Sequence, residues 1–248
     1  MHLILTGATG LVGAAALQAM LTRESVTKIS IISRRPVAMA EGHEKVKVHI
    51  QKDFSTIDST ILEELKGAHG CVWAMGISMN QVTKEEYTKI TQEYPTTFAE
   101  AFSRLSPTFN FVYVSGEGVS TKPPGLFTPS YSTIKGRTET SLLSLSKEHP
   151  SLKVFNLRPG AVDAKDQPEI HPFLPKYTSL QKKGEKLLIP AIRAVMPGLM
   201  SPTKELGEFM VDLAAGDGSP LEGEGTEEGG RTIGNKAFRR KMGFTSGT

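Results

Sequence analysis

The sequence predicts an α/β fold built on a doubly wound parallel sheet. Three observations lead to this fold class. Short apolar runs alternate with helical stretches over the first two-thirds of the chain, a glycine-rich turn follows the first run, and the run Phe109–Ser115 is almost continuously apolar. Alternating strands and helices are typical of parallel sheets with right-handed crossovers, and a strand buried on both faces reads as an unbroken apolar run.

Strands are expected wherever a short apolar or β-branched run is bounded by turn residues. The third of these alternates Val46, Val48 and Ile50 with polar residues, so one of its faces should be wetter. The expected strands are His2–Thr6, Lys28–Ser33, Val46–Ile50, Gly70–Ala74, Phe109–Ser115 and Lys153–Leu157.

Helical stretches lie between these strands at Leu11–Leu21, Lys84–Leu105 and Ser130–Lys147. Pro95 falls inside the second and should kink or interrupt it, because proline lacks the amide hydrogen that an α-helix needs. These stretches complete the strand–helix alternation.

The regular alternation of strands and helices ends after Pro159. Residues 163–202 contain six prolines with short helical pieces between them, which indicates a small cap of short helices and loops. Thr203–Ala214 returns to a regular helix, 216–230 is a Gly/Glu-rich loop, and 231–233 could add a last strand. We therefore expect a core of residues 1–160, followed by residues 161–248 as cap, closing helix and C-terminal segment, all in one structural unit.

Composition excludes several classes of function. The 248 residues carry a formal net charge of +3 with 38% hydrophobic residues, as in a soluble globular protein. The dense basic cluster Arg239-Arg240-Lys241 is best interpreted as a solvated helix face, so no nucleic-acid partner is expected. No apolar stretch approaches the length of a membrane span.

Cysteine and histidine usage points to a reducing compartment and to no metal site. The single cysteine, Cys71, lies in an apolar run and is expected to be a buried packing residue. The histidines are scattered, so no metal site is expected. The first strand begins at the N-terminus without a preceding signal, and a cytoplasmic location is the expectation.

The strongest motif is the turn Gly7-Ala8-Thr9-Gly10-Leu11-Val12-Gly13, between the first strand and the first helix. Small residues let the backbone approach a pyrophosphate, and the helix N-terminus offers free N–H groups to it. This context indicates a Rossmann-type dinucleotide-binding core, although glycines also form ordinary turns. The residues expected to bind the cofactor here are Gly7, Thr9, Gly10, Leu11, Val12 and Gly13.

The end of the second strand favours NADPH over NADH. It offers Ser33, Arg34 and Arg35 where an NAD-selective site usually carries an acid for the ribose 2′-hydroxyl. Guanidinium groups attract a 2′-phosphate, whereas the alternative is a pair of solvated loop arginines. Asp53 and Phe54 follow the third strand, and Asp53 could bind the adenine amino group or serve as a turn residue.

A second motif combines Tyr131 and Lys135, which are four residues apart and so share one helical face. A lysine on a core-facing stripe needs a polar partner. Its ammonium would lower the pKa of a neighbouring phenol toward the range of a general acid. The alternative is a snorkelling surface lysine beside a half-buried tyrosine.

Taken together, these motifs resemble the short-chain dehydrogenase/reductase superfamily, and within it the compact atypical members with an extended-type glycine motif. The resemblance covers nearly all of the N-terminal two-thirds. It rests on the glycine turn, Ser33-Arg34-Arg35-Pro36, Asp53-Phe54, Ser115, Tyr131-Ser132-Thr133-Ile134-Lys135-Gly136 and Arg158-Pro159-Gly160.

The resemblance implies a role for each of these residues. Tyr131 would be the general acid, Lys135 would hold the nicotinamide ribose and tune Tyr131, and Ser115 would hydrogen-bond the substrate carbonyl. The remaining residues expected to bind the cofactor are Ala74, Met75 and Gly76 after the fourth strand, and Pro159, Gly160 and Val162 around the nicotinamide amide.

Two departures from the family pattern leave alternatives open. The family's helix asparagine has no clear counterpart, and Thr91 or Glu93 lies nearest. The serine is followed by Gly116 and stands farther from Tyr131 than in the shortest members. Its role could therefore fall to Ser120, Thr121 or Ser130.

The expected function is an NADPH-dependent reductase that transfers hydride to a ketone or aldehyde of a small organic substrate, acting as a monomer or homodimer. The alternatives are a redox-silent NADPH-binding protein that acts through a partner, and a non-redox isomerase or cyclase. An apolar substrate pocket is indicated, equally with ordinary core, by Met75, Met79, Phe127, Phe173, Leu174 and Tyr177.

Overall fold

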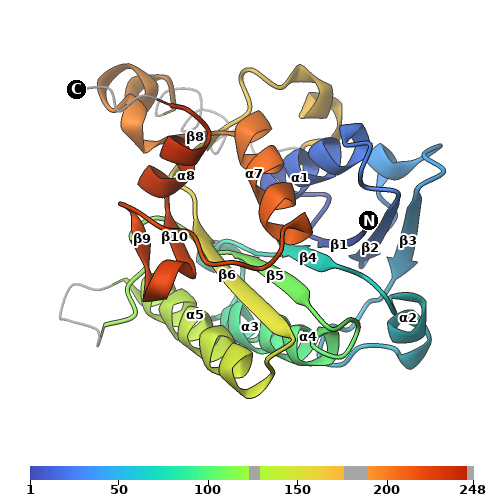
Figure 1. The fold of residues 1–248 in the computed structure, drawn as a ribbon. Coiled ribbons are helices and arrows are strands. Elements are labelled where there is room, and N and C mark those ends of the chain that lie inside the picture. The colour runs from blue at the N-terminus through green and yellow to red at the C-terminus, as the bar shows by residue number, and fades with distance from the viewer. Residues whose placement is uncertain (123–128, 176–188, 245–248) are drawn as a thin grey trace.

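One mostly parallel sheet runs through the protein in the computed structural model, which describes residues 1–122, 129–175 and 189–244 (Figure 1). Its strand order among these residues is β3-β2-β1-β4-β5-β6-β10-β9, and every pairing except that of β9 with β10 is parallel. The strands are β1 (His2–Thr6), β2 (Lys28–Ser33), β3 (Val46–Ile50), β4 (Gly70–Trp73), β5 (Phe109–Val114), β6 (Leu152–Arg158), β9 (Thr226–Glu227) and β10 (Thr232–Gly234).

The strand order reverses between β1 and β4. The chain first moves outward from β1 through β2 to β3, then returns to β4 on the other side of β1 and continues to β5 and β6. In such sheets the carboxyl ends of the strands diverge at the reversal and leave a crevice for ligands. The predicted doubly wound α/β fold is therefore confirmed, and the crevice lies beside the glycine turn.

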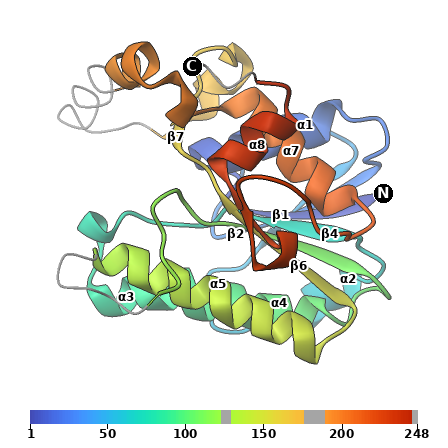
Figure 2. The ribbon, with the colours of Figure 1, turned by 60° about the vertical axis from the view of Figure 1, so that its left-hand side comes forward.

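Helices cover both faces of the sheet, as Figures 1 and 2 show. Residues of β1 alternate between the two sides, with Leu3 and Leu5 in one hydrophobic cluster and Ile4 in the other. One face carries α1 (Leu11–Thr22), α7 (Thr203–Ala215) and α8 (Asn235–Lys241). The other carries α2 (Ser59–Glu64), α3 (Lys84–Thr88), α4 (Tyr94–Phe102) and α5 (Ser130–Glu148).

The C-terminal part of the chain contributes to both the core and the cap. Helix α7 packs closely on α1, since a Cβ added at Gly207 would lie 2.4 Å from the carbonyl oxygen of Ala15. Strand β10 extends the sheet beside β6. Above the sheet, β7 (Ala161–Asp163) pairs with β8 (Met200–Pro202). Asp163 also forms an ion pair with Arg193, which anchors the cap.

The helix expected at Lys84–Leu105 is interrupted, as the position of Pro95 predicts. A π-helical turn, η3 (Lys89–Glu93), separates α3 from α4. Proline has no amide hydrogen to donate four residues back, so the carbonyl of Thr91 loses its helical partner and the helix widens there. The short helix α2, capped by the Asp58 carboxylate, was not expected from the sequence.

The single cysteine is part of the core. Cys71 is buried in the core, and this burial raises the pKa of its thiol well above the ordinary value. No described helix is long and apolar enough to cross a membrane. The described residues contain no group of three or more His, Cys, Asp or Glu side chains placed to hold a metal ion.

The glycine turn allows a first test of the fold. A Cβ added at Gly13 would lie 2.0 Å from the carbonyl oxygen of Gly7, whereas one at Gly10 would lie an ordinary 3.4 Å from the same atom. Gly13→Ala should therefore lower the free energy of unfolding by about 1–3 kcal/mol, as overpacking does. Gly10→Ala should change it much less. Urea unfolding of both variants measures the difference, and equal stabilities would contradict the close contact.

His2 makes the stability depend on pH. Its ring contacts Ser30 Oγ at 2.9 Å, and burial, helped by the charge of Lys28, lowers its pKa from 6.5 to about 4. Between about pH 6.5 and pH 4 the unfolded chain therefore binds a proton at His2 that the folded chain does not bind. The free energy of unfolding is lost as the pH falls through this range. His2→Gln should lose less stability over this range. Thermal unfolding at pH 7 and pH 5 tests this, and parallel losses in both proteins would contradict it.

Candidate functional site

Two adjoining cavities lie at the carboxyl ends of the strands, on either side of the reversal between β1 and β4. Their volumes are about 360 and 540 Å³, and they share Gly10 and residues 74–77 as a common wall. Together they form a continuous groove of the size and place expected for an extended ligand in this kind of sheet. We refer to them as the smaller and the larger cavity.

Most of the residues predicted to bind the cofactor line this groove. In the smaller cavity these are Gly10, Leu11, Val12, Ala74, Met75, Gly76, Lys135, Pro159, Gly160 and Val162, and Ser115, predicted to bind the substrate carbonyl, lines it as well. In the larger cavity they are Gly7, Thr9, Gly10, Ser33, Arg34, Arg35, Phe54, Ala74, Met75 and Gly76. Gly13, Asp53 and Tyr131 are not among the lining residues of either cavity.

The glycine turn brings the start of α1 to the junction of the two cavities. Gly7 has a φ of +72°, and a Cβ there would lie 2.3 Å from the carbonyl oxygen of Ala74, so the turn packs directly against the end of β4. Gly10, the N-cap of α1, offers no side-chain cap, and the first turn carries no acid. The N–H groups at this helix end are thus available to an anionic ligand.

Two arginines stand at the far end of the larger cavity. Arg34 and Arg35 follow β2 and are exposed, and neither forms an ion pair within the described part of the chain. The amide of Arg35 donates to Ser33 Oγ at 3.3 Å, which shapes the turn that carries both guanidinium groups. This end of the groove is therefore cationic.

Asp53 is placed as a turn residue. Its carboxylate accepts the amide of Ser55 at 2.9 Å, and this bond lowers the pKa of Asp53. The neighbouring Phe54 is buried, lines the larger cavity and stacks on Phe98 with ring centroids 5.3 Å apart. Phe54 thus forms an apolar wall next to the arginines.

Lys135 and Ser115 meet in the smaller cavity. Lys135 Nζ donates to the carbonyl oxygen of Ser115 at 2.7 Å, and burial lowers the pKa of Lys135 to about 8. The hydroxyl of Ser115 is buried and has no hydrogen-bond partner among the described residues. A buried hydroxyl without a partner is costly, so this part of the cavity is suited to a polar ligand.

Tyr131 lies apart from this pair. It stands in the first turn of α5, is 43% exposed, and its hydroxyl forms no hydrogen bond with another described residue. Burial raises the pKa of Tyr87, and the Tyr131 phenol adds to this, so the two rings are near one another. The structure therefore brings Lys135 and Ser115 together in the cavity but leaves Tyr131 at its margin.

Tyr113 is a cavity residue to which the sequence assigned no role. Tyr113 on β5 lines the smaller cavity and donates its hydroxyl to the carbonyl oxygen of Thr91 at 3.2 Å. Thr138 Oγ1 lies 3.1 Å from the same oxygen and 3.0 Å from the carbonyl oxygen of Ile134, so its one hydrogen is shared between them. This carbonyl is the one freed by Pro95, so the proline four residues after Thr91 was the available signal. Thr91 also lines the cavity, as one of the two residues nearest to the family's helix asparagine.

The backbone at Gly160 is held by residues from distant parts of the chain. Gly160 N donates to Ser201 Oγ at 2.9 Å, and Ser201 Oγ donates to Asn235 Oδ1 at 2.6 Å. The Pro159 carbonyl accepts the amide of Glu117 at 2.8 Å. No local sequence pattern marks Ser201 or Asn235, because only the fold brings them to this place.

The alternative hydroxyl residues lie outside the groove, whereas one residue predicted for the apolar substrate pocket lines both cavities. The amide of Ser120 donates to Ser132 Oγ on α5. None of Ser120, Thr121 and Ser130 lines either cavity. Met75 lines both cavities, whereas Leu174 packs against the core. Phe127 and Tyr177 lie outside the described residues.

No protein-family model matches the chain. It is 38% identical over 259 residues to leucinostatins biosynthesis cluster protein T of Purpureocillium lilacinum, an alignment that covers 96% of this chain and 94% of that protein. It is also 43% identical over 140 residues to botcinic acid biosynthesis cluster B protein 16 of Botryotinia fuckeliana, covering 55% of this chain and 88% of that protein.

Solved structures agree on the fold. A short chain dehydrogenase family protein from Francisella tularensis superposes with a TM-score of 0.64 at 16% identity, covering 94% of this chain and 96% of that one. The PhqB reductase domain from Penicillium fellutanum gives 0.65 at 14% identity, with 94% and 66% covered. WbmF from Bordetella bronchiseptica, solved with NAD⁺, gives 0.64 at 13% identity, with 99% and 79% covered. The chain thus has the short-chain dehydrogenase/reductase fold, and it belongs to the family of leucinostatins biosynthesis cluster protein T.

Proposed function

We propose that the protein is an NADPH-dependent reductase that transfers hydride to a ketone or aldehyde of a small organic molecule. The observation that carries this proposal is the groove itself. A glycine turn and helix N-terminus occupy its middle, two arginines stand at one end, and Lys135 beside the unpartnered Ser115 hydroxyl stands at the other.

The residues of the groove fit a nicotinamide dinucleotide in three places. The N–H groups at the start of α1 would bind the pyrophosphate, because no side chain caps them. Arg34 and Arg35 would bind a 2′-phosphate on the adenosine ribose. Lys135 would donate to the nicotinamide ribose, and the backbone at Pro159, Gly160 and Val162 would line the nicotinamide amide.

When bound, the cofactor supplies the hydride; the protein supplies orientation and a proton. Ser115 Oγ would donate to the substrate carbonyl oxygen and so gain the partner that it lacks within the described structure. Tyr131 would give its phenolic proton to the same oxygen as negative charge develops there. The ammonium of Lys135 would favour this by stabilising the phenolate that remains.

The proposed substrate class is supported by the relatives. Both matched proteins are named for biosynthesis clusters, and one superposed structure is named as a reductase domain. A small molecule also suits the space available, since the smaller cavity has a volume of only about 360 Å³.

A second candidate function, redox-silent NADPH binding, is favoured by one observation. Tyr131 is 43% exposed and does not line either cavity, so the proton donor is not assembled beside Lys135 in this structure. The cofactor residues would then act alone, and the protein would act through a partner. Turnover separates the two functions.

The arginine pair should set the choice of cofactor. We expect NADPH to bind at least about ten-fold more tightly than NADH, which corresponds to about 1.4 kcal/mol. Arg34→Ala and Arg35→Ala should each reduce this preference by weakening NADPH alone. Arg137→Ala, which removes an exposed arginine outside the groove, is the matched control. Calorimetry with both cofactors measures the preference, and equal affinities in the wild type would refute the 2′-phosphate assignment.

Tyr131 should control the chemical step. Because Tyr131→Phe removes the proton donor but no cofactor contact, turnover should fall by about 10² to 10⁴ with little change in NADPH affinity. Lys135→Ala should lower both. Tyr87→Phe, which removes a nearby buried hydroxyl, should retain activity. NADPH oxidation screened against a carbonyl library, with product detection, provides the measurement. Full turnover by Tyr131→Phe would exclude it as the acid, and binding without turnover in every protein would favour the redox-silent function.

A further inference from the structure

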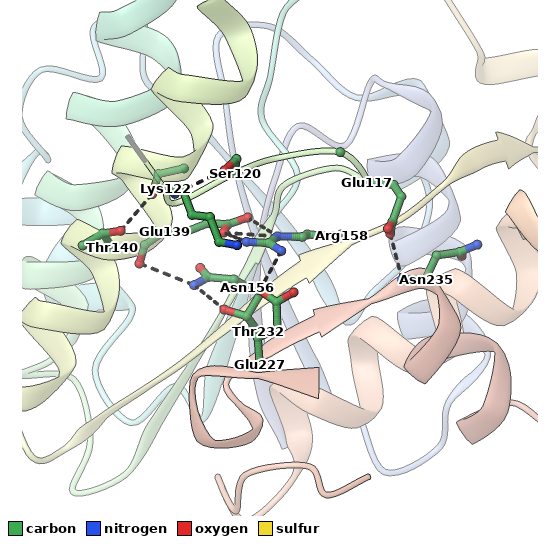
Figure 3. A network of polar contacts seen from close by, with 12 residues as sticks. Glu117, Ser120, Lys122, Glu139, Thr140, Asn156, Arg158, Glu227, Thr232 and Asn235 are labelled. Carbon is green, nitrogen blue, oxygen red and sulfur yellow. Dashed lines mark hydrogen bonds and ion pairs between the residues drawn. The ribbon is translucent and has the colours of Figure 1, made fainter. Parts of the chain in front are cut away.

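An ionic network joins α5, the end of β6 and β9 (Figure 3). The carboxylate of Glu139, on α5, is completely buried and binds the guanidinium of Arg158, at the end of β6, with both oxygens. The Nε–Oε1 and NH2–Oε2 distances are 3.0 and 2.6 Å. Arg158 also contacts the carboxylate of Glu227 on β9 at 3.0 Å, but this third residue is largely exposed.

The network joins two segments that both line the smaller cavity. Glu139 follows Lys135 by four residues, so the two side chains share one face of α5. Arg158 directly precedes Pro159 and Gly160, whose backbone lines the same cavity. The contact of Glu139 with Arg158 therefore ties the helix that carries Lys135 to the strand end that precedes Pro159 and Gly160.

The energetics suggest that this contact does more than stabilise the fold. The attraction within a buried ion pair offsets only part of the free energy needed to remove two charges from water. Proteins in which apolar residues of similar volume replace such a pair are often equally stable. Its planar two-point geometry, however, fixes distance and orientation closely. The backbone of the helix is engaged as well, because Asn156 Nδ2 donates to the carbonyl oxygen of Glu139 at 3.4 Å.

We propose that Glu139 is a positioning residue of the hydride-transfer site, which holds Lys135 against the Ser115 carbonyl by clamping α5 to the end of β6 through Arg158. This inference rests on the proposed function for its role in catalysis. The clamp itself is a property of the protein without any ligand and can be tested as such.

The negative charge of Glu139 also favours the protonated form of Lys135, which is the form that donates to the Ser115 carbonyl. Burial lowers the pKa of Lys135 to about 8, and the Glu139 carboxylate opposes this. The Ser115 carbonyl faces the ammonium from β5, and Tyr113 lines the same cavity. Arg158 and Glu227 bind one another next to Glu139. Removal of the Glu139 charge would remove this opposition to burial, so Lys135 would lose its proton at a lower pH, whether or not Arg158 is present.

Carbamylation by cyanate tests the clamp directly. Cyanate is small enough to enter the cavity, and it reacts only with the neutral form of an amine. The rate at which Lys135 is modified, measured at several pH values by peptide mass spectrometry, therefore reports the protonation of Lys135. In Glu139→Gln we expect the profile to move to lower pH, with roughly five-fold faster modification at pH 7 for a ten-fold change in the proton equilibrium. Glu139→Asp keeps the charge but shortens the side chain that reaches Arg158, so its profile should move in the same direction as that of Glu139→Gln, but less far.

Two further variants keep the test decisive. If Glu139→Gln does not fold, because Arg158 is left buried without a partner, the double variant Glu139→Met/Arg158→Met removes both charges and should show the same direction of change. Glu227→Gln removes only the exposed partner of Arg158 and should leave the profile unchanged. A folded Glu139→Gln or double variant with a wild-type profile overturns the proposal.

The failure of this proposal can be told apart from failure of the proposed function. Carbamylation is measured on the protein without cofactor or substrate, whereas calorimetry with NADPH tests the cofactor site. A wild type that binds no NADPH refutes the reductase and leaves the carbamylation result standing. If NADPH does bind, Glu139→Gln should bind it about ten-fold more weakly, since Lys135 is displaced. Unchanged affinity with a folded variant would refute the catalytic role of the clamp.

Discussion

The contact between the glycine turn and the end of β4 is the constraint on which the rest of the site depends. Gly7 and Gly13 have no side chain, so the backbone of the turn packs against itself and against Ala74 at distances that no Cβ would permit. The start of α1 is thereby set beside the carboxyl ends of the parallel strands. Gly10 becomes the shared wall of both cavities, and the groove continues from the arginines to Lys135.

A second constraint shapes the inner wall of the smaller cavity. Pro95 frees the carbonyl of Thr91, which then accepts hydrogen bonds from Tyr113 and Thr138. These bonds join η3, β5 and α5 at the place where Lys135 also reaches back to β5. A single missing amide hydrogen in the helix thus affects the wall of the cavity, which Thr91 itself lines.

The sequence predicts the sheet and most of the groove because these depend on local pattern. The apolar runs locate the strands of the core to within one residue at either end, and the glycine spacing locates the turn. The arginines and Lys135 follow from their positions at strand ends and on a helix face. By contrast, Ser201 and Asn235 reach Gly160 from far along the chain. Such long-range contacts produce no periodic pattern in the sequence. The exposure of Tyr131 produces none either, because it depends on the tertiary packing of the first turn of α5.

The packing of α7 on α1 has a consequence for how the chain is made. The apolar face of α1 meets Gly207, and strand β10 joins β6, only after a long intervening stretch of chain has been synthesised. The part of the sheet face that α7 covers therefore stays exposed until α7 has been made, long after β1 and α1. Contacts of such high sequence separation slow folding and leave apolar surface exposed meanwhile. The nascent protein should accordingly depend on chaperones more than a protein whose helices pack on their immediate neighbours.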